Sequence, residues 1–141
     1  MSISLLSLHH PPAPAYSSGF LRLRLPFDRN EIEGCFQKRF RGVVSHLPEH
    51  LAVVDGQHYL TYRALDQASD ILAQAVYQFT RGKPVPVAIL SPHNAAAVIT
   101  IVGILKAGAI YVALDASLPE ATLQNILIDS RALLLVADSS M

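Results

Sequence analysis

Apolar residues recur at helical spacing along several parts of the chain, and the first such stripe lies near the start. Residues 30–45 carry six apolar side chains three or four positions apart, and Asp28 or Asn30 is a candidate N-cap. Pro48 cannot continue a helix and Gly34 weakens one, but the spacing predicts a helix over 30–45. The stripe consists of Ile32, Cys35, Phe36, Phe40, Val43 and Val44.

Two short apolar runs follow, at 51–54 and 58–60, and Asp55-Gly56 separates them. Asp-Gly between apolar runs is a strong signal for a β-hairpin. Thr61 then begins a second helix as its N-cap, and Gly82 ends it. The spacing places five side chains on the buried face of this helix: Leu65, Ala68, Leu72, Val76 and Phe79.

From residue 85 onward, short apolar strands alternate with helices. Strands are expected at 85–90, 110–114 and 133–136, and a helix that is apolar nearly all round is expected at 95–106. Ser117 and Glu120 have the spacing of a capping box, which predicts another helix up to about Ser130. This order predicts an α/β fold, a parallel sheet with helices on both faces.

The composition suggests part of a larger core. Apolar residues make up 51% of the chain and charged residues only 16%, against about 25% charged in typical globular proteins. The formal net charge is zero, which favours neither a nucleic-acid nor a membrane-surface partner. Lys106 interrupts the apolar stretch 95–114, so this stretch is expected to form core structure rather than a membrane span.

Cys35 is the only cysteine, so no intrachain disulfide can form, which favours a reducing compartment such as the cytoplasm. We interpret Cys35 as a small apolar residue on a helix face rather than as a nucleophile. Residues 1–27 lack the basic and long apolar regions of a signal peptide and are expected to form a flexible lead segment, followed by the domain at 28–141.

His46, Glu49 and His50 match the His-x-x-Glu-His pattern of one class of zinc peptidase. That chemistry requires both histidines on one face of a helix, and Pro48 lies between them and breaks a helix. We therefore expect a loop with two solvated histidines and no metal ligand.

Several motifs, in order, resemble the start of the adenylate-forming (AMP-binding) ligases, most closely the amino-acid adenylation domains of nonribosomal peptide synthetases. The resemblance covers roughly residues 27–138. It rests on the helix with Glu31, Phe36 and Phe40, on Pro48, on the stretch Leu60-Thr61-Tyr62-Arg63-Ala64-Leu65, on the stretch Leu105-Lys106-Ala107-Gly108-Ala109-Ile110-Tyr111-Val112-Ala113-Leu114-Asp115, and on Leu118-Pro119 and Ile128-Asp129-Ser130.

The chain departs from the family pattern at three places. Ala64 replaces a glutamate that would complete a capping box with Thr61, at a cost of about 0.5–1 kcal/mol. Ala113 and Ala116 stand where prolines are usual.

Lys106 is interpreted as a helix-end charge rather than a nucleotide contact, since the family's catalytic lysine belongs to a C-terminal domain. Gly108 is expected to supply a positive φ for the turn after it.

The resemblance implies a parent reaction in which ATP and Mg²⁺ activate a carboxylate as an acyl-adenylate and a carrier-protein thiol then accepts the acyl group. In the family, a glycine-rich phosphate loop lies downstream of the matched region. The seven glycines of this chain are all isolated, so no such loop can be built from them. We therefore predict no catalytic, cofactor-binding or metal-binding residue in the chain, and no adenylating activity for it alone.

Two other interpretations remain open. The chain is alternatively a non-catalytic interaction or scaffold module, completed by a partner chain and prone to self-association through an exposed sheet edge. A small Rossmann-like nucleotide-binding protein is disfavoured, because the turns at 91–94 and 115–119 contain no glycine for close phosphate approach.

Overall fold

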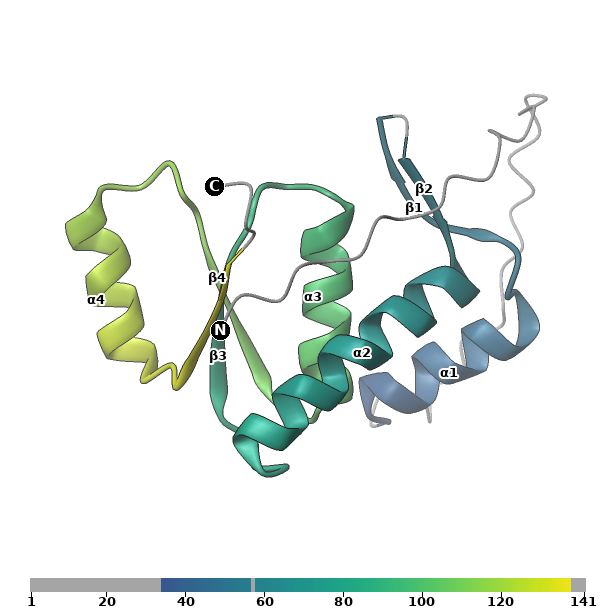
Figure 1. The fold of residues 1–141 in the computed structure, drawn as a ribbon, viewed down its shortest axis with the longest axis horizontal. Coiled ribbons are helices and arrows are strands. Elements are labelled where there is room, and N and C mark those ends of the chain that lie inside the picture. The colour runs from purple at the N-terminus through teal and green to yellow at the C-terminus, as the bar shows by residue number, and fades with distance from the viewer. Residues whose placement is uncertain (1–33, 57, 138–141) are drawn as a thin grey trace.

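The computed structural model describes residues 34–56 and 58–137, and the lead segment proposed for 1–27 lies outside these residues. Figure 1 shows the arrangement of the elements. The helices are α1 Phe36–His46, α2 Tyr62–Thr80, α3 Ala95–Lys106 and α4 Glu120–Ser130. The strands are β1 Leu51–Asp55, β2 His58–Thr61, β3 Pro86–Leu90, β4 Ile110–Leu114 and β5 Leu134–Ala137.

The last three strands form a parallel sheet in the order β4-β3-β5, which confirms the α/β fold class. In the central strand, Val87 pairs with Tyr111 on one side and with Leu134 on the other. Strands β1 and β2 form a separate antiparallel hairpin, as Asp-Gly predicts, and Gly56 has a φ of +57° at its turn. Gly108 has the expected positive φ, +74°, between α3 and β4.

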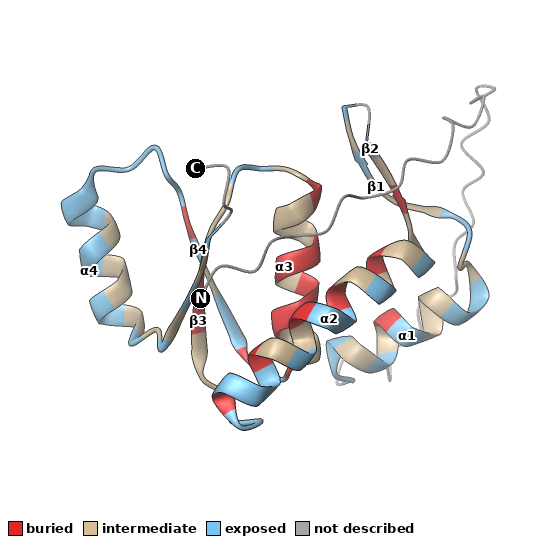
Figure 2. Ribbon diagram, in the orientation of Figure 1, coloured by how far each residue is buried: buried red, intermediate tan, exposed pale blue. Residues whose placement is uncertain are grey.

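Helices α2 and α3 cover one face of the parallel sheet (Figure 1). Residues with almost no exposed surface lie between the layers, as the red segments of Figure 2 show. They include Leu72, Val76, Val87, Ile89 and Ile104. Helix α3 packs closely on α2, because a Cβ atom added to Gly103 would lie 2.9 Å from Leu72 Cβ and 3.0 Å from the Ser69 carbonyl oxygen. Glycine at this position permits the close helix crossing.

A second cluster joins the hairpin and α1 to the same two helices. It contains Phe40, Leu60, Leu65, Ala95, Ile99 and Val102. The Phe36 and Phe40 rings stack at 5.6 Å between centroids. The Gln37 side chain donates to the Leu105 carbonyl oxygen at 2.6 Å, so the first turn of α1 is held against the last turn of α3.

Helix α4 lies on the opposite side of the sheet (Figure 1) and has no buried residue. Helices are thus present on both faces, as predicted, but α4 leaves apolar residues of the sheet and of the turn before β5 in contact with solvent. Ile110 is 52% exposed, Leu133 64% and Leu135 46%. Within the described residues, β4 and β5 each have one unpaired edge.

Several details of the predicted elements were wrong, beside shifts of one residue in the bounds of β1, β2 and β3. The first helix begins at Phe36 rather than at residue 30, and Cys35 is its extended N-cap. Phe79 is 59% exposed, because Thr80 takes the buried position in the last turn of α2. The capping box at Ser117 does not form, since Pro119 precedes α4 without a side-chain cap. Finally, β5 extends over Leu134–Ala137, one residue later than expected at each end.

Candidate functional site

The carboxyl ends of β3 and β4 are the part of the sheet where ligands usually bind in open α/β folds. The loops that follow these strands bring His93, Asp115 and Ser117 near one another, and Ser91 lies in the same loop as His93. His93, Asp115 and Ser117 are exposed and Ser91 is partly buried. We therefore take this edge as the candidate site.

The amino end of α3 opens onto this edge, but two of its first three N–H donors already have side-chain partners. The Ala97 N–H donates to Asn94 Oδ1 at 3.0 Å, and the Ala95 N–H donates to Asp55 Oδ2 at 3.0 Å. Asp55 belongs to the hairpin, so it also ties the hairpin to α3. Free N–H groups and positive helix-end charge bind phosphate at such positions, and a carboxylate already occupies this one. This arrangement is unfavourable to the Rossmann-like interpretation.

Asp115 organises the loop after β4. Its Oδ1 accepts the Ser117 N–H at 2.9 Å, and its carbonyl oxygen accepts the Leu118 N–H at 3.0 Å. The hydrogen bond from the Ser117 backbone is the main cause that lowers the pKa of Asp115, with smaller contributions from the Ser117 hydroxyl and from His93. This turn also explains the missing capping box, because the Ser117 backbone is engaged with Asp115 rather than with α4.

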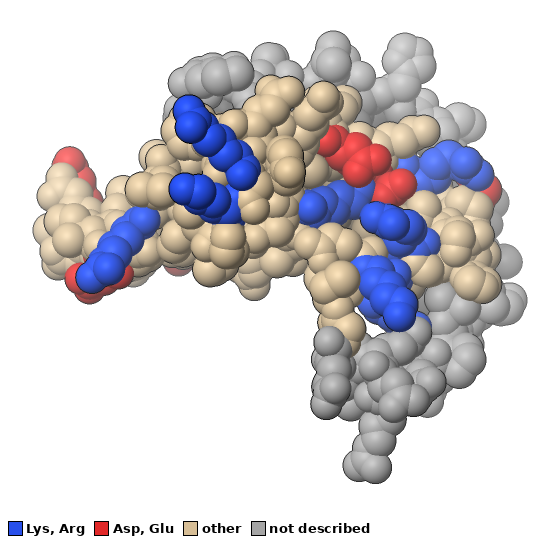
Figure 3. Space-filling model, turned by 90° about the horizontal axis from the view of Figure 1, so that it is seen from below, with Lys and Arg blue, Asp and Glu red and all other residues tan. Residues whose placement is uncertain are grey.

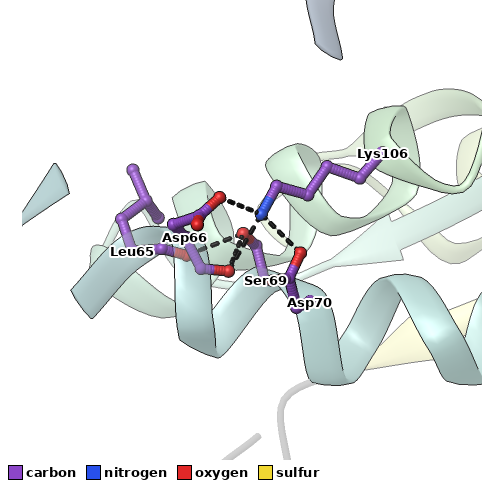
Figure 4. A network of polar contacts seen from close by, with 5 residues as sticks. All are labelled: Leu65, Asp66, Ser69, Asp70 and Lys106. Atoms are coloured by element: carbon purple, nitrogen blue, oxygen red, sulfur yellow. Dashed lines mark hydrogen bonds and ion pairs between the residues drawn. The ribbon is translucent and has the colours of Figure 1, made fainter. Parts of the chain in front are cut away.

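Lys106 lies at the other end of the sheet, in the last turn of α3 as predicted. Figure 4 shows its ammonium between two carboxylates of α2. Nζ lies 2.6 Å from Asp66 Oδ1, 2.7 Å from Asp70 Oδ1 and 2.9 Å from the Asp66 carbonyl oxygen. It also lies 5.1 Å from the centroid of the Phe40 ring.

These contacts make Lys106 a structural link between α3 and α2. An ammonium has three N–H donors, and three oxygens accept from this one. Its side chain is only 11% exposed, so little of it can reach a ligand. A hollow of about 350 Å³ beside it, lined also by Gln37 and Arg41, is bordered by carboxylates that Lys106 already pairs. Figure 3 shows Lys and Arg side chains next to Asp and Glu side chains on this underside of the molecule.

The His-x-x-Glu-His segment has a structural role. Helix α1 ends at His46, and the segment that follows forms a turn, as predicted. The carbonyl oxygens of Pro48 and His50 accept the Arg63 and Tyr62 N–H groups, each at 2.9 Å. Glu49 pairs with Arg63 at 2.7 Å. Across the described ranges, no group of three or more His, Cys, Asp or Glu side chains could hold a metal ion.

The same segment adds hydrogen-bond partners at the start of α2, whose capping box is incomplete. Thr61 Oγ1 accepts the Ala64 N–H at 3.1 Å, so half of the box survives. The Pro48 and His50 carbonyls satisfy the two preceding N–H donors, which a glutamate at position 64 would not reach. The helix start therefore has partners for its first three N–H groups.

Cys35 does not lie on the apolar face of a helix, which corrects the interpretation from the sequence. It is exposed, precedes α1, and borders an open hollow with Lys38, Arg41 and Ser45. The helical spacing gave a wrong position for Cys35, because the buried face of α1 begins further along the helix, at Phe40, which is 8% exposed.

The sequence alone did not reveal the partners that hold these residues. Asp66 and Asp70 are four apart and thus share a face of α2, but only the helix crossing brings Lys106 to them. Asp55 was recognised as a turn residue, and nothing local indicates that it caps a helix forty positions later.

Comparison with known proteins decides the family. The AMP-binding enzyme family matches residues 40–141. The chain belongs to this family. This match confirms the family resemblance inferred from the motifs at Thr61 and Lys106. It covers the hairpin, the parallel sheet and helices α2 to α4.

Curated relatives include large synthetases. The chain is 34% identical over 128 residues to the bassianolide nonribosomal cyclodepsipeptide synthetase of Beauveria bassiana, which corresponds to 89% of this chain and 4% of that protein. It is 34% identical over 107 residues to zwittermicin A synthase ZmaJ of Bacillus cereus, corresponding to 76% of this chain and 20% of that protein. The chain thus spans a small part of the relatives that it matches.

Solved structures agree with this placement. The N-terminal subdomain of Klebsiella oxytoca NpsA, in complex with 3-hydroxybenzoyl-AMSN, matches with a TM-score of 0.68 and 26% identity over 75% of this chain and 27% of that one. An artificially fused adenylation–PCP di-domain, NpsA-ThdA, matches with a TM-score of 0.66 and 27% identity over 73% of this chain and 20% of that one. The fold corresponds to part of an adenylation N-terminal subdomain.

Proposed function

We propose that this chain is the N-terminal part of a domain that adenylates an amino acid or another carboxylate. In the complete domain, ATP and Mg²⁺ would convert the carboxylate to an acyl-adenylate with release of pyrophosphate, and a carrier-protein thiol would accept the acyl group. The observation that carries the proposal is the match of 75% of this chain with the NpsA N-terminal subdomain, whose structure holds an adenylate analogue.

Residues 28–141 are assigned to the adenylation domain and contribute scaffold rather than reacting groups. The Ala95 and Ala97 N–H groups at the start of α3 are occupied, Lys106 is paired, and no glycine-rich phosphate loop occurs in the sequence. We expect the 141-residue polypeptide alone to show no carboxylate-dependent ATP–pyrophosphate exchange. Exchange above background from the purified polypeptide would refute this.

A chimera tests the positive half of the proposal. Residues 40–137 replace the matching segment of NpsA, and exchange is measured with the carboxylates that NpsA accepts. The expected result is a folded chimera that retains exchange. A matched chimera also carries Gly103→Ala, which disturbs the crossing of α2 and α3. Its exchange activity is expected to fall, which would show that the activity depends on the transplanted segment. A chimera that melts cooperatively like NpsA but shows no exchange would contradict the proposal.

The second candidate is a non-catalytic interaction module completed by a partner chain. The unpaired edges of β4 and β5, together with the exposed apolar side chains of the sheet, favour it. On this proposal the polypeptide self-associates through its sheet edge, which size-exclusion chromatography tests directly. A nucleic-acid partner is not expected. None of the described helices is long and apolar enough to cross a membrane, and the proposed location is the cytoplasm.

A further inference from the structure

The two crossovers of the parallel sheet run in opposite directions. The chain passes from β3 through α3 to the neighbouring strand β4, and then from β4 through α4 to β5 on the far side of β3. Because crossovers between parallel strands are right-handed, two crossovers of opposite direction place their helices on opposite faces. Figure 1 shows this arrangement, with α3 on one face of the sheet and α4 on the other.

The same rule decides where a further parallel strand can join the sheet. A strand beside β4 would need a crossover on the face of α3, because the chain would again move in the direction from β3 to β4. Helices α2 and α3 already cover that face, where Val87 and Ile89 of the central strand are 0% and 4% exposed. A strand beside β5 would need a crossover on the face of α4. The structure therefore favours the β5 edge and the face of α4 for the next crossover.

The side chains of β5 are uncovered on this face. Leu134 and Val136 pack on the core with α2 and α3, so Leu135 between them points to the face of α4. Leu135 is 46% exposed, and Leu133, in the turn before β5, is 64% exposed. Ala88, the partner of Leu135 in the central strand, is 0% exposed. Burial on this face thus ends at β5.

The main chain of β5 is unpaired along its outer edge. The Leu133 N–H donates to the Pro86 carbonyl oxygen, at 3.0 Å, on the side of β3. Successive N–H groups of a strand point to opposite edges, so Leu134 and Val136 direct theirs away from β3. In the part of the chain that the structure describes, no strand pairs with this edge. These N–H groups require acceptors once apolar surface around them is buried.

We infer that the next helix and strand of a complete adenylation domain dock on β5. The strand pairs in parallel with the β5 edge, and the helix before it packs an apolar stripe over Leu133 and Leu135. The inference rests on the adenylation function proposed above and names the surface through which this segment joins the rest of the domain. The match covers only 27% of the NpsA N-terminal subdomain, so such a domain contains ample further chain. None of the residues of β3, β4 or β5 is charged, and the docking strand is expected to be apolar as well.

Amide hydrogen exchange of the NpsA chimera tests the strand pairing. In the isolated 141-residue polypeptide, as a dilute monomer, the Leu134 and Val136 N–H groups are expected to exchange rapidly. In the chimera both are expected to exchange at least about tenfold more slowly, because the next strand accepts them. The Val87 N–H, in the central strand, is the matched control and should be protected in both proteins. Equally rapid exchange of Leu134 and Val136 in a folded chimera overturns the inference.

Leu135→Lys tests the helix that packs on the same face. In the isolated polypeptide the lysine reaches water, and the melting temperature is expected to stay nearly unchanged. In the chimera the helix buries the ammonium without a partner, and the melting temperature is expected to fall by at least about 3 °C. Ile71→Lys is the control, because Ile71 is 61% exposed on α2 between the exposed Gln67 and Gln74. A chimera that tolerates both substitutions equally overturns the inference.

The docking inference and the adenylation proposal fail in different ways. A folded chimera without ATP–pyrophosphate exchange contradicts the adenylation proposal, whatever the protection of the β5 amides. A chimera that retains ATP–pyrophosphate exchange but leaves Leu134 and Val136 unprotected supports the adenylation proposal and overturns the docking on β5.

Discussion

Replacing Lys106 by methionine tests whether the lysine is a structural tie between helices. The substitution keeps the apolar stem and removes the ammonium, which is bonded to Asp66 and Asp70 and lies over the Phe40 ring. Breaking a fully buried ion pair costs about 3–5 kcal/mol, whereas an exposed pair contributes about 0–1 kcal/mol. The Lys106 side chain is 11% exposed, but Asp66 and Asp70 are 32% and 65% exposed and remain partly hydrated after its loss.

These exposures place the expected loss of unfolding free energy between the two limits, at about 1–3 kcal/mol. Most of the loss should belong to the pair with Asp66, which is the more buried carboxylate. A double-mutant cycle with Asp66→Asn is therefore expected to show a larger coupling energy than a cycle with Asp70→Asn. Urea unfolding, followed by far-ultraviolet circular dichroism, supplies the free energies.

Arg63→Met is the matched control, because the Arg63–Glu49 pair has a similar length, 2.7 Å, but its side chains are 55% and 71% exposed. Its expected cost is below about 1 kcal/mol. If Lys106→Met were no more destabilising than Arg63→Met, burial would not distinguish the two pairs and the tie would have no structural importance.

The other predictions concern helix packing, capping and pH. Gly103→Ala is expected to destabilise the fold by about 1–3 kcal/mol through overpacking. In Gly42→Ala nothing lies within 4 Å of the new methyl group, so this variant should stabilise α1 by about 0.5–1 kcal/mol. Urea unfolding of both variants measures the contrast. Asp55→Ala removes the acceptor of the Ala95 N–H at the start of α3 and should cost about 0.5–2 kcal/mol, although Asn94 still caps the helix. Asp55→Asn keeps an acceptor and should cost less, as thermal melts would show. Folding lowers the pKa of Asp115 from 3.8, so its carboxylate stabilises the fold above that pH, and this contribution is lost as the pH falls through the lowered value. Asp115→Asn should flatten this dependence of stability on acid pH. An NMR titration that finds an ordinary pKa for Asp115 would contradict the prediction.

The order of elements could be predicted because each apolar run ends at local turn chemistry. Gly56, Gly82 and Gly108 all have positive φ at the ends predicted for the hairpin, α2 and α3. Such signals act within a few residues, so they can be found in the sequence without tertiary contacts. The motif at 105–115 was informative for the same reason, since it joins a helix end, a turn and a strand in one continuous stretch.

The errors arise where tertiary contacts choose between local alternatives. Ser69 has no exposed surface although serine is usually read as a surface residue; its hydroxyl donates to the Leu65 carbonyl oxygen at 2.6 Å, and it faces Gly103. Thr80 is buried by the same kind of local bond, and Phe79 beside it is left exposed. A polar residue that satisfies itself within its helix can replace an apolar one in the core, and periodicity does not detect this.

The family motifs of this chain lie at junctions between elements. Thr61 begins α2 at the end of the hairpin, Lys106 joins the end of α3 to α2, and Asp115 fixes the loop after β4. The Thr61 and Asp115 contacts fix local turns, and the Lys106 contacts place α3 on α2. If these residues shape the scaffold, their substitution in a complete adenylating domain should lower stability more than it alters the dependence of exchange on ATP concentration. A change in the apparent ATP affinity without loss of stability would instead assign them to the site.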